Sequence, residues 1–104
     1  MVMMTAKQLA ESAESGDSLP EGLDLGLKAL WLARADRWDD AHDLCEDVAD
    51  PDGSWIHAYL HRVEGDLGNA GYWYYRAEKP QPAGQSGLDE EWLAIAEALL
   101  GQQG

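Results

Sequence analysis

The three histidines of the chain lie in its middle third, and two of them have the spacing of metal ligands. His57 and His61 are four residues apart, so on a helix their imidazoles lie about one turn apart on the same side. Glu64 continues that side, seven residues after His57. Two imidazoles at this spacing are a common way for one helix to supply two ligands to a divalent metal such as zinc. His57, His61 and Glu64 therefore form a candidate site.

A third imidazole, His42, lies on the preceding predicted helix. If the two helices form a hairpin, His42 faces the second helix and supplies a third nitrogen. Nearby side chains could give a further ligand, or a carboxylate that orients a ring nitrogen; they are Asp39, Asp43, Cys45 and Glu46. The metal hypothesis thus assigns His42, His57 and His61 to a divalent cation, with Glu64 as fourth ligand or as a base.

The same residues also have an interpretation without a metal. At 100° per residue, the core stripe of the helix runs through Ile56, Leu60 and Val63. His57 then lies at the edge of this stripe, and His61 lies further round, towards solvent. On this interpretation the histidines are surface side chains that form hydrogen bonds with neighbouring acids.

The sequence contains no complete catalytic motif. Ala58 follows His57 where a zinc-protease helix has its glutamate base, and no glycine-rich loop carries the lysine of a phosphate-binding loop. Cys45 falls on the apolar side of its helix with Trp38 and Val48, which predicts a small buried hydrophobe rather than a nucleophile. No residue is assigned to catalysis, and the question of enzymatic activity stays open.

The segments that must position these side chains have helical periodicity throughout. Apolar residues recur at helical spacing between capping patterns and glycine or proline breaks. The expected helices cover about 5–14, 20–35, 36–49, 54–64, 70–77 and 87–101. No segment has the period of two that a strand requires. We predict an all-α fold, a compact bundle of five to six short helices in a single domain over residues 1–104.

Polar residues at the starts of these segments set the expected boundaries. Thr5 with Gln8 has the pattern of a capping box. Ser18 precedes a first turn that contains proline, and Asp36 and Ser86 open the third and last helices. Each of these residues is therefore expected to cap a helix.

Two windows of the chain, residues 34–45 and 63–74, align at an offset of 29 residues. The alignment pairs Ala41 with Ala70, and each window predicts a helix, a tight polar turn and a second helix. The expected organisation is two hairpin units, about 23–49 and 54–78, followed by a C-terminal helix at about 87–101.

The second of these windows contains motifs of known repeats. EGD at 64–66, NA at 69–70 and YWYYRA at 72–77 resemble the second half of a tetratricopeptide or Sel1-like repeat. WIHAYLHR at 55–62, followed by the same run, also resembles a signature of small bacterial helical proteins of uncharacterised function. The repeat resemblance implies antiparallel hairpins like those of tetratricopeptide repeats, and a groove for a protein or peptide. The short period and the two copies depart from the family and favour a closed bundle.

The aromatic residues point to a binding surface. The chain has five Trp, four Tyr and no Phe, so every aromatic side chain carries a polar group that suits half-buried positions. Four consecutive aromatics at 72–75 cover the whole circumference of a short helix, so some of them must lie away from the core. The leading hypothesis is a small acidic binding protein that holds a protein, a peptide or a second copy of itself, as a homodimer, on a surface made of Trp55, Tyr72, Trp73, Tyr75 and Arg76.

The charge of the chain excludes some classes of partner. Seven Lys+Arg against 20 Asp+Glu give a formal charge of −13, and no basic cluster reverses it. Such a surface repels phosphate backbones and anionic lipid, so we expect neither nucleic acid nor a membrane as partner. No apolar run approaches the roughly 18 residues of a membrane-spanning helix. The single cysteine fits a reducing compartment, and a cytoplasmic location is expected.

Overall fold

The computed structural model describes residues 4–16 and 18–102. Helices and turns account for the structure of these residues, which contain no strand, so the predicted all-α class is confirmed. The helices are α1 (Ala6–Glu14), α2 (Leu25–Arg34), α3 (Trp38–Cys45), α4 (Asp52–Glu64), α5 (Leu67–Ala77) and α6 (Leu88–Gln102). In the described ranges, none of them combines the length and the apolar composition that crossing a bilayer demands.

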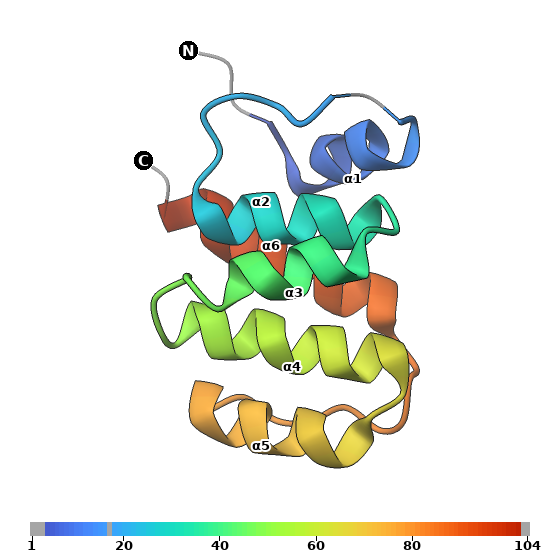
Figure 1. The fold of residues 1–104 in the computed structure, drawn as a ribbon, viewed down its shortest axis with the longest axis vertical. Helices are drawn as coiled ribbons and strands as arrows, with labels where there is room; N and C mark the ends of the chain where they lie inside the picture. Colours follow the sequence, from blue (N-terminus) through green and yellow to red (C-terminus); the bar gives the residue numbers. More distant parts are fainter. Residues whose placement is uncertain (1–3, 17, 103–104) are drawn as a thin grey trace.

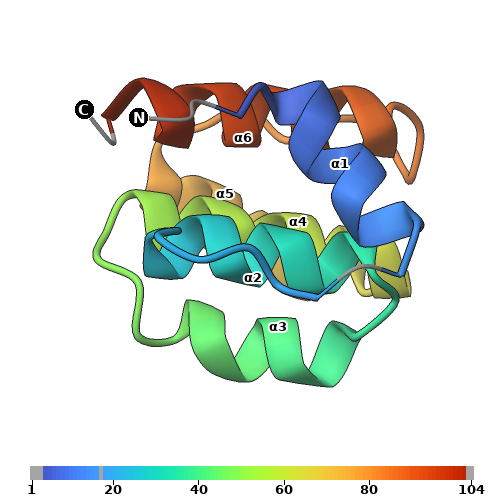
Figure 2. The same ribbon diagram turned by 90° about the horizontal axis from the view of Figure 1, so that it is seen from above.

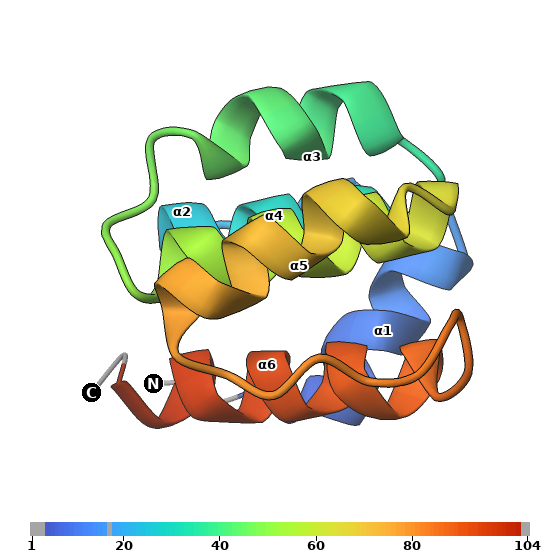
Figure 3. The ribbon, with the colours of Figure 1, turned by 90° about the horizontal axis from the view of Figure 1, so that it is seen from below.

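The helices are arranged in three layers, which Figures 2 and 3 show edge on. The middle layer holds α2, α4 and α5, α3 covers one of its faces, and α6 with α1 covers the other. Along the long axis of the molecule, α1, α2, α4 and α5 follow one another (Figure 1). As a result α4 packs against α2, α3, α5 and α6.

Two pairs of consecutive helices pack closely, α2 with α3 and α4 with α5. The second pair is joined by only Gly65 and Asp66. Gly65 ends α4 in the left-handed conformation, with φ of 87°, which a glycine adopts without a Cβ clash. The Asp66 side chain then accepts a hydrogen bond from the Asn69 amide and caps α5. This short turn makes α4 and α5 antiparallel neighbours.

The main hydrophobic core lies between α1, α2, α3, α4 and α6, and a smaller one between α4 and α5. The buried indoles in and around the main core donate to fixed acceptors, which offsets the cost of burying their N–H groups. These bonds are Trp31 to Ser12 Oγ at 3.2 Å, Trp38 to the Leu60 carbonyl at 2.8 Å, and Trp92 to the Leu30 carbonyl at 2.8 Å. The first two join consecutive helices, α1 with α2 and α3 with α4, and the third joins α6 to α2.

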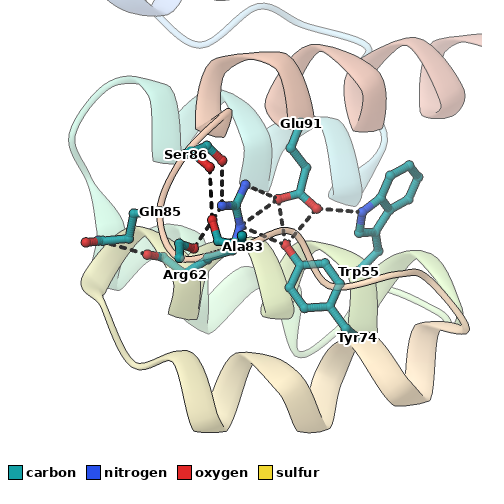
Figure 4. A network of polar contacts seen from close by, with 8 residues as sticks. Trp55, Arg62, Tyr74, Ala83, Gln85, Ser86 and Glu91 are labelled. Carbon is teal, nitrogen blue, oxygen red and sulfur yellow. Dashed lines mark hydrogen bonds and ion pairs between the residues drawn. The ribbon is translucent and has the colours of Figure 1, made fainter.

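A buried ion pair holds α6 and the 78–87 segment against α4 and α5. The guanidinium of Arg62, on α4, is fully buried and lies 3.0 Å from Glu91 Oε1 on α6 (Figure 4). Tyr74, on α5, donates its hydroxyl to the same carboxylate at 2.6 Å, and Trp55 donates its indole N–H at 3.1 Å. Burial and the neighbouring Glu91 raise the pKa of Tyr74, so its hydroxyl stays a donor.

The irregular segment 78–87 completes the shell around Arg62. Arg62 Nη1 donates to the carbonyls of Gly84 at 3.0 Å and Ser86 at 2.8 Å. In return, Gln85 donates to the Arg62 carbonyl at 3.0 Å. All these partners are needed because a buried charge costs several kcal/mol unless its donors are satisfied.

A glycine permits close approach of the chain at the start of α4. Gly53 is buried, and a Cβ at this position would collide with the carbonyl oxygen of Val48. The turn between α3 and α4 therefore lies directly against α4, where it forms one wall of the pocket described below.

Some predicted boundaries are wrong, and turn geometry explains the differences. Residues 18–22 do not begin a helix, because Gly22 turns the chain with φ of 82° and α2 starts only at Leu25. Asp36 has φ of 64°, so the cap of α3 falls one residue later, at Arg37. The fifth helix begins three residues earlier than expected, at Leu67, because Asp66 caps it.

The capping predictions at the two ends of the chain have different outcomes. The capping box of Thr5 and Gln8 is present, with reciprocal bonds of 3.1 and 3.0 Å. Ser86 does not cap α6, because its hydroxyl donates to the Ala83 carbonyl at 2.9 Å. The helix begins after Gly87, whose carbonyl accepts a hydrogen bond from the Glu91 amide at 3.0 Å.

Replacing Glu91 by alanine should lower the free energy of unfolding by about 3–5 kcal/mol, because it leaves the Arg62 charge buried without its counter-ion. Urea unfolding followed by circular dichroism measures this loss. The matched control is Glu90→Ala, which removes an exposed carboxylate from the same helix and should change stability by no more than about 0.5 kcal/mol. Equal midpoints for the two variants would contradict the structural role given to the ion pair.

Candidate metal site

The structure brings the three histidines together between α3 and α4. One ring nitrogen from each of His42, His57 and His61 lies within 4.8 Å of those of the other two. The ring centroids are 4.5 Å apart for His42 and His57, 5.3 Å for His42 and His61, and 5.1 Å for His57 and His61. Three imidazoles at this separation can share one metal ion.

His61 is buried, with 6% of its surface exposed, whereas the helical angle predicted that it faces solvent. Val63, predicted on the core stripe, is 37% exposed. The expectation for His61 is wrong because a stripe assumes that only one side of a helix is buried, whereas α4 packs against α2, α3, α5 and α6.

The closest contact in the cluster is a hydrogen bond between two imidazoles. Nε2 of His57 and Nε2 of His42 are 2.8 Å apart. One nitrogen must carry a proton and the other a lone pair, because two lone pairs or two N–H groups would repel each other. Two ligands at the Zn–N distance in tetrahedral geometry are about 3.3 Å apart, so a metal could replace this shared proton after a small outward movement of the rings.

The environment keeps His57 neutral at pH 7. Burial is the main cause that lowers its pKa from 6.5 to about 4, and the neighbouring His42, His61 and Arg76 add to the shift. Asp50 acts in the opposite direction. A metal binds the neutral form of histidine, so His57 carries no second, cationic proton that a metal would have to displace at pH 7.

Glu64 lies behind His61 and holds its ring. Glu64 Oε2 is 2.6 Å from His61 Nδ1, so Nδ1 carries the proton and Nε2 of His61 keeps the lone pair. Among the described residues, Glu64 and Asp66 form a separate group with His61 and do not join the three-histidine cluster. The structure thus favours Glu64 as an orienting carboxylate over Glu64 as the fourth ligand.

Two tryptophans lie flat against the cluster and limit the movement of its rings. Trp38 stacks on His42 with ring centroids 4.9 Å apart and an interplanar angle of 13°. Trp73 stacks on His57 at 3.8 Å and 10°. The sequence pattern assigned Trp38 to the core, although its position four residues before His42 is a spacing that places two rings on one helix face.

An open pocket of about 570 Å³ adjoins the histidines. Its lining includes all three imidazoles and residues from α3, α4, α5 and the turn between α3 and α4, among them Glu46, Asp50, Ser54, Asn69, Trp73 and Arg76. Sequence reasoning did not assign Asp50, Ser54 or Asn69 to a site. Asp50 in particular was interpreted as part of a turn before proline. Because this open pocket is lined by the three histidines, small molecules could reach a metal that they hold.

Cys45 also lines the pocket, but its thiol is not reactive. The side chain is buried, and its S–H donates to the carbonyl of His42 at 3.1 Å. Burial, together with Glu46 and Asp43, raises the pKa of the thiol to about 12. The expected small buried side chain is what the structure shows.

The five residues of the predicted binding surface are divided between different environments. Tyr72 and Tyr75 are 56% and 83% exposed, and Arg76 is exposed beside them. Trp73 is half-buried against His57. Trp55 is half-buried as well, bonded to Glu91 on one edge and covered by the Lys79 ammonium 4.3 Å from its ring centroid. The exposed aromatic surface on α5 is thus smaller than the sequence predicts.

Comparison with known proteins gives no family or relative, because no family model, curated protein or solved structure matches this chain. The resemblance to tetratricopeptide and Sel1-like repeats stays a prediction.

The stability of the metal-free chain should fall as the pH is lowered from 6.5 to about 4. In this range the unfolded chain binds a proton at residue 57 that the folded chain does not, because folding lowers the pKa of His57. The shift corresponds to about 3 kcal/mol of unfolding free energy. Urea unfolding in the presence of a chelator, at a series of pH values, measures the slope. His57→Gln should have a flatter slope, and an identical slope would disprove the assignment.

Proposed function

We propose that the protein binds one divalent transition-metal ion, such as zinc, through His42, His57 and His61. The observation that carries this proposal is the convergence of three ring nitrogens within 4.8 Å of one another. Glu64 supports the set by fixing the tautomer of His61, as carboxylates behind metal-binding histidines commonly do. The low pKa of His57 adds support, because that ligand is neutral at pH 7.

The chemistry of the donors selects the class of metal. Three imidazole nitrogens suit zinc, copper, nickel or cobalt, whereas calcium and magnesium prefer oxygen ligands. The excess of negative charge on the chain, −13, raises the local concentration of cations around the site. Both features favour a transition metal over an alkaline-earth ion.

The ligand count and the open pocket favour a reactive site over a purely structural one. Structural zinc sites have four protein ligands, whereas catalytic zinc sites have three and keep a position for water or substrate. Here three histidines adjoin a pocket of about 570 Å³. A metal in this position would act as a Lewis acid on a bound molecule, or lower the pKa of a bound water. We therefore infer a metal-dependent enzyme or a metal-dependent binding protein.

The alternative is an interaction protein that uses its aromatic surface, and it has less support. Of the five residues of that surface, only Tyr72, Tyr75 and Arg76 are exposed. Trp73 contributes instead to the histidine cluster, where it stacks on His57. The arrangement of the indoles thus fits the metal hypothesis better than a continuous docking surface.

Purified protein dialysed against zinc or cobalt and then against buffer should retain one metal ion per chain, measured by elemental analysis. His61→Ala should retain none, because it removes one of three ligands. At a metal concentration 1,000 times the dissociation constant, the parent should gain about 4 kcal/mol of unfolding free energy. Cys45→Ala is the control, since it removes a sulfur from the pocket lining and should keep the metal. A parent without metal, or a His61→Ala variant that retains it, would refute the proposal.

Replacing Glu64 by glutamine should weaken metal binding about 10- to 100-fold, because the ring of His61 loses the carboxylate that orients it. Competition titration against a chromophoric chelator measures the affinity. The matched control is Asp66→Asn, which removes the same charge two residues away and keeps a side chain that can cap α5. If both variants lose affinity equally, the effect is one of net charge and not of the contact with His61.

A further inference from the structure

In the described part of the chain, the lining of the pocket contains one Lys or Arg side chain in addition to the three histidines. Arg76, on α5, is the only Lys or Arg among the described residues that line it. The chain has only seven Lys+Arg in all. Next to a divalent metal ion this guanidinium would form a second positive group, and an anion placed between the two would be attracted by both.

Arg76 is held in place from two sides. Its Nη2 lies 2.8 Å from Asp50 Oδ2, and its guanidinium carbon lies 5.1 Å from the ring centroid of Trp73. Asp50 is itself fixed, since its Oδ1 accepts from the amide of Ser54 at 3.1 Å and from the hydroxyl at 2.6 Å. These bonds lower the pKa of Asp50, so the pair stays ionised.

The same contacts connect Arg76 to the histidine cluster. The indole of Trp73 lies against His57 at 3.8 Å and within cation–π distance of Arg76. Hydrogen bonding to Tyr72 and the charge of Asp50 raise the pKa of Arg76. The guanidinium has five N–H donors, of which the bonds to Asp50 and Tyr72 use two.

We propose that the pocket binds a small oxyanion, a carboxylate or a phosphoryl group, between the metal ion and the guanidinium of Arg76. This inference rests on the proposed metal site. Anionic oxygens suit the open position of a three-histidine metal, and the planar guanidinium matches carboxylates and phosphates in shape and charge. The pocket volume of about 570 Å³ falls in the range of small-molecule sites, about 300–1,000 Å³.

The anion should bind only when the metal is present. The carboxylates of Glu46 and Asp50 also line the pocket, and the chain as a whole carries a charge of −13. Without the metal these charges outweigh the single guanidinium and repel an anion. The two positive charges of the metal reverse this balance in the pocket. Asn69, which also lines it, offers an amide donor to the same ligand.

The test uses the full chain loaded with cobalt, whose visible absorption changes when an anion enters its coordination sphere. Inorganic phosphate and acetate are titrated separately into the parent, Arg76→Gln and Arg37→Gln. Arg37 is the matched control, because it is also an exposed arginine paired with an aspartate, at 2.7 Å from Asp40, but it lies outside the pocket. A metal-free sample, followed by isothermal titration calorimetry, is the second control.

We expect the spectrum of the parent to change saturably with at least one of the two anions. Arg76→Gln should need at least about tenfold more anion, Arg37→Gln should match the parent, and the metal-free chain should bind neither. Saturation by phosphate alone or by acetate alone identifies the preferred group. A parent that holds cobalt but responds to neither anion, or an Arg76→Gln variant that matches the parent, overturns this inference alone. A parent that holds no cobalt overturns the proposed metal site as well.

Discussion

The buried ion pair of Arg62 and Glu91 fixes the orientation of α4, and the arrangement of the site follows from it. A fully buried guanidinium is tolerated only if its donors are satisfied, and here the acceptors come from α5, α6 and the 78–87 segment. Rotation of α4 about its axis would break these bonds together. His61 precedes Arg62 on the same helix, about 100° away around the axis, so the bonds that hold the arginine on one side also direct the imidazoles of α4 towards α3.

The electrostatics of the cluster are those of a site prepared for a cation. In the metal-free chain, His42 and His57 share one proton across 2.8 Å, and the low pKa of His57 opposes a second one. The carboxylate of Glu64 already forms a hydrogen bond with His61 Nδ1. Stacking on Trp38 and Trp73 holds the rings of His42 and His57 close together.

Sequence periodicity predicted the helices because apolar spacing and turn residues are local properties. A spacing of four within one helix and a hairpin before it also gave the meeting of the histidines as one of two hypotheses, beside that of separate surface side chains, and the three ring nitrogens do converge. The burial of His61 and Arg62 was not predicted. Both depend on α4 being surrounded, which is a property of the whole fold, and arginine is ordinarily an exposed residue. The start of α2 was misplaced because Pro20 suits a helix start as well as a turn, and only the conformation of Gly22 decides between them.

The stacking of two indoles on two of the histidines has a spectroscopic consequence. Trp38 and Trp73 lie within 4.9 and 3.8 Å, by ring centroids, of His42 and His57. A protonated or metal-bound imidazole accepts electron density from the excited state of an indole in contact with it, whereas a neutral imidazole does so weakly. Trp31, Trp55 and Trp92 stack on none of the histidines among the described contacts, so the fluorescence of Trp38 and Trp73 should report the chemical state of the histidines over a background from the other three indoles.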